Sequence, residues 1–240
     1  AGLVVAGIGV PAAAALWTHS LDIPRNDDWA YRRILFEFAH TGHYSLVGWG
    51  AMSLVGQIMW AAPFVLVLGA HAWAPGLAVA AAAAIGLASV HFVARSVVGR
   101  PSAVAVALTV LALPGFLVNT STFMSDVPAF SADVACLGLG LFALARPPGE
   151  HWASVIASVA VGILGFSIRE FDLAAPLTVL IVLAAADRRR LAPYSIVAVC
   201  TLVACGAIYA WTAALPHAQL KHLGLPTALS WQNLGVSYFT

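Results

Sequence analysis

Charge is what this chain has least of. Asp, Glu, Lys and Arg together make up 9% of the 240 residues, whereas a soluble domain has about a quarter. Eleven basic and ten acidic residues leave a net charge of +1, which offers no basic surface to nucleic acid. The apolar share is 61%, and this excess indicates a surface that faces lipid. The composition therefore predicts a polytopic protein whose partner is a lipid bilayer.

Cysteine and the common catalytic motifs are also scarce. The three cysteines, Cys136, Cys200 and Cys205, all lie in apolar runs without the paired spacing of a metal site. We expect them to pack as small hydrophobic residues. No phosphate-binding Gly loop, nucleophile elbow or Cys–His pair occurs. The chemistry must therefore depend on the few carboxylates and arginines.

Apolar runs recur along the whole chain, most of them near the length that a helix needs to cross ~30 Å of hydrocarbon. They cover residues 1–17, 46–70, 77–94, 102–118, 127–145, 152–168, 171–186 and 194–211. We interpret 1–17 as a first transmembrane helix rather than a signal-peptide core, because no clear cleavage site follows it. The first residue is not Met and the last follows a polar stretch, so we expect a chain truncated at both ends.

Arginines in the short loops indicate how these spans are oriented. The strongest basic cluster is the run at 188–190. Placing it in the cytoplasm also places 95–100 and 146–151 there, and leaves 119–126 and 167–170 outside. Every basic loop between spans then faces the cytoplasm, apart from Arg169.

The number of membrane crossings conflicts with this orientation at one place. Two apolar runs, 46–70 and 77–94, lie between the first span and the loop 95–100, whereas a single crossing is needed there. If 1–17 enters from the cytoplasm, one of these runs does not cross. We favour 46–70, which is rich in Gly and contains Gln57 and Pro63, as an interfacial or re-entrant helix pair. The alternative, in which 46–70 crosses and the acidic loop faces the cytoplasm, stays open.

The topology in which 46–70 does not cross predicts an all-α polytopic membrane protein. About seven transmembrane helices are expected, with interfacial helices in a long first outer loop. The single module 1–240 then divides into a first span at 1–17, an outer loop at 18–76, further spans over 77–211 and an outer segment at 212–240.

The densest group of charges is Asn26-Asp27-Asp28-Trp29-Ala30-Tyr31-Arg32-Arg33. We expect a helix over 27–41, capped by Asn26 or Asp27 and ended by Gly42. A carboxylate at a membrane surface can act as a general base or bind a metal ion. The alternative is that Asp27 and Asp28 stabilise the helix start and pair with Arg32 or Arg33.

Asp126 and Asp133 form a second acidic pattern, seven residues apart on one face of the span 127–145. Asp126 either caps this helix or contributes to a polar site. Asp133 is two turns deeper, and an acid inside a membrane span usually faces a polar cavity. His91 is one candidate partner for it.

Arg169 and Glu170 follow the span 152–168. An arginine outside the cytoplasm suits an anionic partner, for example a lipid phosphate. The alternative is a local ion pair between Arg169 and either Glu170 or Asp172.

Three separated motifs together resemble the GT-C type glycosyltransferases, especially the branch with the protein O-mannosyltransferases and the aminoarabinose transferases. They are Asp27-Asp28-Trp29-Ala30-Tyr31 followed by Gly42-His43-Tyr44, then Ser125-Asp126-Val127-Pro128, then Ile168-Arg169-Glu170. The resemblance covers about residues 15–190. It departs from the family at Asp28, where Glu is common, and at Gly48-Trp49-Gly50, which replaces a Pro-Pro or Lys-bearing segment.

The resemblance implies an inverting transfer of a sugar from a polyprenyl-phosphate donor to a hydroxyl or amine of a glycan, lipid or protein acceptor. The reaction would occur on the extracytoplasmic face, in the plasma or inner membrane of a bacterium. Asp27 would deprotonate or orient the acceptor, Asp28 would assist, Asp126 would complete the site and Arg169 would bind the donor phosphate. Tyr31 and Glu170 would support this site. No cofactor is implied with certainty, and a divalent metal ion would be held by Asp27 and Asp28.

Two other functions compete with this interpretation. A transporter or a flippase for lipid-linked sugars would use Asp133 and His91 as the carrying groups. It would often show an internal repeat, and none is evident. In a non-catalytic scaffold subunit, the acids would only cap helices.

Overall fold

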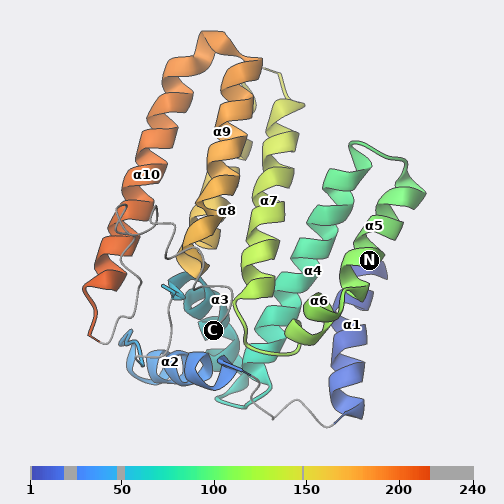
Figure 1. Cartoon of the computed structure of the whole chain (residues 1–240), viewed down its shortest axis with the longest axis vertical. Helices are drawn as coiled ribbons and strands as arrows, with labels where there is room; N and C mark the ends of the chain where they lie inside the picture. Colours follow the sequence, from blue (N-terminus) through green and yellow to red (C-terminus); the bar gives the residue numbers. More distant parts are fainter. Residues whose placement is uncertain (1, 19–25, 48–51, 148, 217–240) are drawn as a thin grey trace, which may run out of the picture.

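The computed structural model describes residues 2–18, 26–47, 52–147 and 149–216, and every regular element in these residues is helical (Figure 1). The elements are α1 (Gly2–Trp17), α2 (Asp28–Thr41), α3 (Val55–Leu68), α4 (Ala74–Arg95), α5 (Arg100–Ala112), α6 (Pro114–Asn119), α7 (Asp126–Leu144), α8 (Trp152–Ile168), the 3-10 turn η1 (Glu170–Leu173), α9 (Ala174–Ala186), the 3-10 turn η2 (Arg188–Arg190) and α10 (Leu191–Ala213). The motif Gly48-Trp49-Gly50 and most of the expected outer segment 212–240 lie outside the described residues.

The long helices stand next to one another along the long axis of the molecule (Figure 1). α7 packs against α4 on one side and α8 on the other, and α10 packs against α9 and α8. Three segments are long and apolar enough to cross a membrane: α4, α7 and the joined η2 and α10. The all-α class and a membrane location follow from these segments, whereas the count of about seven spans stays a prediction.

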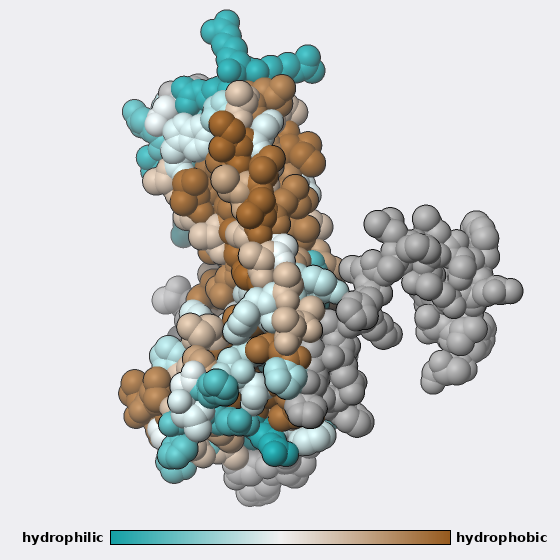
Figure 2. All heavy atoms as spheres, turned by 90° about the vertical axis from the view of Figure 1, so that its left-hand side faces the viewer, coloured by the Kyte–Doolittle hydropathy of each residue, from teal (hydrophilic) through white to brown (hydrophobic). Residues whose placement is uncertain are grey.

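The outer surface of the bundle agrees with a lipid environment. On the α10 side, hydrophobic side chains dominate the middle of the molecule and hydrophilic ones gather near its ends (Figure 2). Ile196, Val199 and Val203 on α10 are each more than half exposed. Such a row of exposed aliphatic side chains would be costly in water and is normal against lipid tails.

The connections between long helices fall into two groups at opposite ends of the bundle (Figure 1). The α4–α5, α7–α8 and α9–α10 connections share one end, which therefore carries the basic segments 95–100, 146–151 and 188–190. α2 and α3 lie at the other end, together with the start of α7 and the end of α8. This grouping of the loops is the one that the arginine pattern predicts.

α2 is the helix expected over 27–41, and it lies across the end of the bundle (Figure 1). It buries Ala30, Tyr31, Ile34 and Leu35 almost completely. Gly42 ends it in the left-handed conformation, with φ of 70°, and its N–H donates to the Phe38 carbonyl at 2.8 Å. Glycine adopts this conformation without a steric penalty.

The apolar run 46–70 contains α3, whose 14 residues extend about 21 Å, less than the ~30 Å of a hydrocarbon core. It packs against α2, α4 and α8. Gln57 donates to the Phe123 carbonyl at 3.0 Å, and Trp60 donates to the Ala78 carbonyl at 2.8 Å. These bonds hold α3 to the ends of its neighbours, and its non-crossing assignment stays a prediction.

Two expected spans are not single helices. The run 102–118 is divided into α5 and α6, because Pro114 has no N–H to donate and forces Leu113 into an extended conformation, with φ of −62° and ψ of 124°. The run 171–186 starts with the turn η1, and α9 begins only at Ala174. Cys136 and Cys205 are buried as expected, but Cys200 is exposed on α10.

Candidate active site at the α2 end of the bundle

Arg169 connects the start of α7 with the end of α8. Its Nη2 lies 2.7 Å from Oδ1 of Asp126, and its Nε donates to Oγ of Ser125 at 2.9 Å. The side chain of Arg169 is 16% exposed and that of Asp126 is 41% exposed, so solvent reaches this ion pair from the carboxylate side. The alternative of a local ion pair with Glu170 or Asp172 does not hold, because the ion-pair partner of Arg169 comes from α7.

Tyr31 brings α2 into the same group. Its buried hydroxyl is hydrogen-bonded to the Asp27 carboxylate. Burial is the main cause that raises the pKa of Tyr31 to about 12, and the carboxylates of Asp27 and Asp126 add to it while Arg169 opposes it. The hydroxyl therefore stays protonated at neutral pH and donates to Asp27. Asp27, Tyr31, Asp126 and Arg169 thus form one charged group, which we call the outer cluster.

Asp28 lies apart from the outer cluster. It is fully buried, and its two oxygens accept from Nε and Nη2 of Arg32 at 2.5 and 2.8 Å. Nη1 of Arg32 donates to the Ala72 carbonyl at 2.7 Å. Asp28 therefore attaches α2 to the segment before α4, and its pairing with Arg32 is the alternative that the sequence left open. The role of an assisting or cation-binding carboxylate stays a prediction. No group of three or more His, Cys, Asp and Glu suited to a metal ion occurs among the described residues.

Glu170 has a positioning contact beside the outer cluster. Its Oε1 accepts from the Ser53 N–H at 2.8 Å, and Oγ of Ser53 donates to the Ser167 carbonyl at 2.9 Å. Tyr44 donates to the Ser53 carbonyl. Burial, and then the Glu170 carboxylate, raise the pKa of Tyr44. Glu170 thus fastens the segment before α3 to the turn that follows Arg169, a contact between distant segments that no sequence spacing indicates.

Asp172 is a buried acid whose importance the sequence does not indicate. It is 1% exposed, and its carboxyl group meets that of Asp133 on α7. Burial and the Asp133 carboxylate raise the pKa of Asp172 to about 8, with Arg169 opposing. Nδ1 of His91, Oδ1 of Asp133 and both carboxyl oxygens of Asp172 are buried without a hydrogen bond of normal geometry among the described residues, so the two carboxyl groups are close neighbours. Asp133 therefore lies beside a second carboxyl group, that of Asp172, and the candidate partner His91 stays a prediction.

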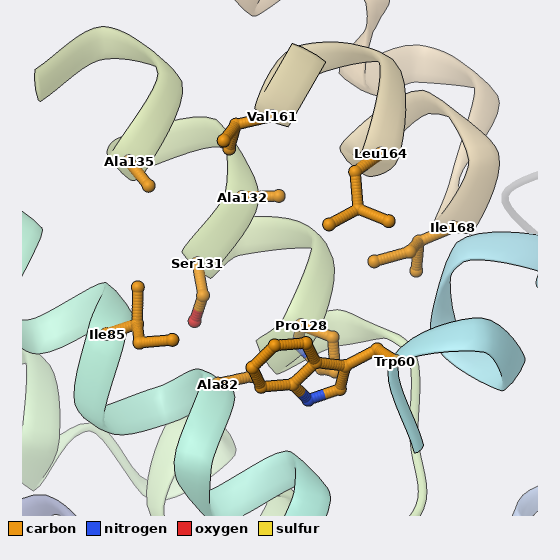
Figure 3. Close-up of a pocket in the computed structure, with 10 residues that line it drawn as sticks. All are labelled: Trp60, Ala82, Ile85, Pro128, Ser131, Ala132, Ala135, Val161, Leu164 and Ile168. Atoms are coloured by element: carbon orange, nitrogen blue, oxygen red, sulfur yellow. The ribbon is translucent and has the colours of Figure 1, made fainter. Parts of the chain in front are cut away.

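An apolar pocket lies beside the outer cluster, between α3, α4, α7 and α8 (Figure 3). Its volume is about 180 Å³, and its lining consists of Trp60, Ala82, Ile85, Pro128, Ser131, Ala132, Ala135, Val161, Leu164 and Ile168. Pro128 is two residues from Asp126, and Ile168 directly precedes Arg169. The pocket and the ion pair are therefore built on the same ends of α7 and α8.

The arrangement places a carboxylate, a tyrosine and an arginine–carboxylate pair next to an apolar pocket. Such a site can accept a proton and bind a phosphate that is attached to a hydrocarbon chain. No family model, no curated protein and no solved structure matches the chain.

Proposed function

We propose that this protein is a membrane glycosyltransferase that moves a sugar from a polyprenyl-phosphate donor to an acceptor hydroxyl or amine at the outer cluster. The observation that carries the proposal is the convergence of Asp27 just before α2, Asp126 from α7 and Arg169 just after α8. These are the residues to which the resemblance assigns the acceptor and the donor phosphate, and 142 positions of the chain separate the first from the last.

The proposed reaction breaks the bond between the sugar C1 and the phosphate oxygen. The acceptor oxygen or nitrogen attacks C1 while its proton passes to Asp27, and the phosphate leaves with the bonding electrons. Charge on the phosphate grows during this step, so an arginine beside it stabilises the transition state more than the bound donor. The Tyr31 hydroxyl keeps the Asp27 carboxylate in one orientation.

The apolar pocket supports a donor with a hydrocarbon chain. The wall made of Trp60, Pro128, Leu164 and Ile168 is apolar, which suits isoprene units better than the charged diphosphate and the ribose of a sugar nucleotide. A chain that enters this pocket leaves its phosphate at the ends of α7 and α8, where Arg169 lies. The position of the basic loops at the other end of the bundle favours an outer cluster on the extracytoplasmic face.

Release of polyprenyl phosphate tests the proposal without knowledge of the acceptor in advance. The protein in lipid nanodiscs would be supplied with a panel of polyprenyl-phosphate hexoses and pentoses and with an envelope extract as the acceptor source. Asp27→Asn is expected to lower the rate by ~100-fold or more, as for a positioned general base. Glu37→Gln on the same helix is the matched control and is expected to leave the rate unchanged.

Two results would contradict the proposal. The first is the absence of release with every donor of the panel, and the second is a rate in Asp27→Asn close to that of the unsubstituted protein. In the second case Asp27 would serve only the start of α2.

A transporter or flippase remains a second candidate because of the carboxyl groups of the buried Asp172 and the half-buried Asp133. A carboxyl pair within a helix bundle can carry a proton during transport. Sealed vesicles separate the two functions. Proton-coupled movement of a lipid-linked sugar that Asp133→Asn abolishes and Asp27→Asn leaves intact would favour the transporter.

A further inference from the structure

A second pocket lies at the opposite end of the bundle from the outer cluster. It has a volume of about 180 Å³ and is lined by Ala143, Leu144, Arg146, His151, Leu183, Ala186, Asp187 and Tyr194. We call it the basic-end pocket. His151 and Tyr194 are polar and yet only 4% and 3% exposed. Such burial of polar side chains requires hydrogen-bond partners.

The hydrogen bonds of His151 leave one donor unused. The Gly149 N–H points at Nδ1 of His151 at 3.3 Å, so Nδ1 is an acceptor and the neutral ring carries its hydrogen on Nε2. Nε2 lies 2.8 Å from Oη of Tyr194 and therefore donates to it. The hydroxyl hydrogen of Tyr194 then has no acceptor among the described residues. A ligand oxygen in the basic-end pocket would satisfy this buried donor.

The charges around this pocket favour an anionic ligand. Arg146 lies over the Phe142 ring at 4.5 Å and has no ion pair within the described part of the chain. The single carboxylate of the lining, Asp187, is paired with Arg190 at 3.3 Å and accepts from the Arg189 N–H. Its charge is therefore compensated from within the chain, whereas that of Arg146 is not.

We propose that the basic-end pocket binds the phosphate of an anionic phospholipid in the surrounding leaflet. Tyr194 would donate one hydrogen bond to the phosphate and Arg146 would bind it through its guanidinium group. A free phosphate could make the same two contacts. The lipid is favoured because Leu144 in the pocket wall is 42% exposed on the outside of the bundle, where an acyl chain would run. Arginine-rich loops also lie on the side of the membrane that carries anionic lipids.

Native mass spectrometry of the protein released from nanodiscs of phosphatidylcholine and phosphatidylglycerol measures the retained lipid. Tyr194→Phe keeps the ring against Trp152 and removes only the hydroxyl. Arg146→Gln removes the charge and leaves the His151–Tyr194 hydrogen bond in place. Each variant is expected to lower phosphatidylglycerol affinity about tenfold, because each removes one charge-assisted contact, without changing phosphatidylcholine retention. Arg95→Gln, at the same end of the bundle, is expected to retain the lipid.

Three outcomes would overturn the proposal. Equal loss in Arg95→Gln would mean that lipid associates with the basic end as a whole. Full retention in Arg146→Gln and in a folded Tyr194→Phe variant would mean that the pocket binds no lipid. Equilibrium dialysis of radiolabelled inorganic phosphate against lipid-free protein is expected to show no binding at micromolar concentrations. Binding that depends on Tyr194 would identify a free anion instead.

Discussion

Arg169 has an ion pair and a hydroxyl contact in place before any donor binds. Nη2 is engaged by Asp126 and Nε by Ser125, which leaves the remaining N–H groups for a phosphate. A lysine keeps the charge but cannot make the same planar set of contacts. We therefore expect Arg169→Lys to lower kcat by roughly tenfold to a hundredfold, with a smaller effect on donor affinity.

Turnover and thermal midpoint, measured together for Arg169→Lys and Arg169→Ala, check this prediction. If Arg169 serves only the ion pair with Asp126, the lysine variant keeps full turnover and the alanine variant loses stability. That result would mean that Arg169 does not bind the donor phosphate.

The raised pKa of Asp172 predicts that the stability of the folded protein depends on pH. This pKa is about 8 in the folded protein, against the ordinary value of 3.8. Between these values the folded protein holds a proton that the unfolded chain has released, so the free energy of unfolding falls as the pH rises through this window. Burial of Asp172 is the main cause of the raised pKa that sets the upper limit of this window; Asp133 and Glu170 add to it, and Arg169 opposes it.

Asp172→Asn removes this titration. The thermal midpoint of the variant in detergent is expected to vary less between about pH 5 and pH 8 than that of the unsubstituted protein. Glu150→Gln, an exposed acid at the other end of the bundle, is the control and is expected to keep the original pH profile. Identical profiles for Asp172→Asn and the unsubstituted protein would mean that Asp172 is ionised throughout.

Asp27 and Asp28 show how far the sequence determines the site. Both acids have a partner four residues further on, Tyr31 and Arg32, because residues at this spacing share a helix face. The sequence indicates the acidic pair and the alternative of an ion pair between Asp28 and Arg32. It could not decide which acid is buried, because that depends on the contact of Arg32 with the Ala72 carbonyl, a contact between segments that no local pattern encodes.

At the scale of elements, the start of α3 depends on Gly56. A Cβ atom at this position would lie 2.4 Å from Oγ of Ser167 and 2.6 Å from the Leu164 carbonyl oxygen. Gly56→Val is therefore expected to push α3 away from α8 and to lower stability by about 1–3 kcal/mol, as overpacking does. The contact of Ser53 with Glu170 lies next to this position, so transfer is expected to fall as well.

Gly206→Val is the matched control, because no atom lies within 4 Å of a Cβ at Gly206 on α10. Thermal midpoints of both variants in the same detergent measure the difference. An unchanged midpoint in Gly56→Val would mean that α3 is not packed on α8 in the membrane.

Apolar runs predict most helices of this chain closely. The run 152–168 coincides with α8, and 127–145 differs from α7 by one residue at each end. Apolar runs predict the wrong helix boundaries at two kinds of place. A proline can divide an apolar stretch into two helices, as Pro114 does, and a charged turn such as η1 can precede the helix. Hydropathy cannot show either event, because it averages over the residues concerned.

At the scale of the whole molecule, the two groups of connections predict opposite accessibility. Asn26, before α2, and Val98, between α4 and α5, are both exposed and lie at opposite ends of the bundle. A cysteine at each position, introduced after replacement of Cys136, Cys200 and Cys205, is expected to react with a membrane-impermeant maleimide from opposite sides. Labelling of both from the same side would support the alternative in which 46–70 crosses.

The position of Asp133 along α7, one of the segments that could cross a membrane, has an electrical consequence. Asp133 is seven residues beyond Asp126 on α7, which is about 10 Å along the helix axis and about a third of the hydrocarbon thickness. If the outer edge of the hydrocarbon lies at Asp126, a proton that passes from the outer cluster to Asp133 would cross about a third of the transmembrane voltage. At 100 mV this corresponds to about 0.8 kcal/mol, or about a fourfold change in protonation. Asp27 and Arg169 lie at the end of the bundle, so their charge states would hardly respond to the same voltage.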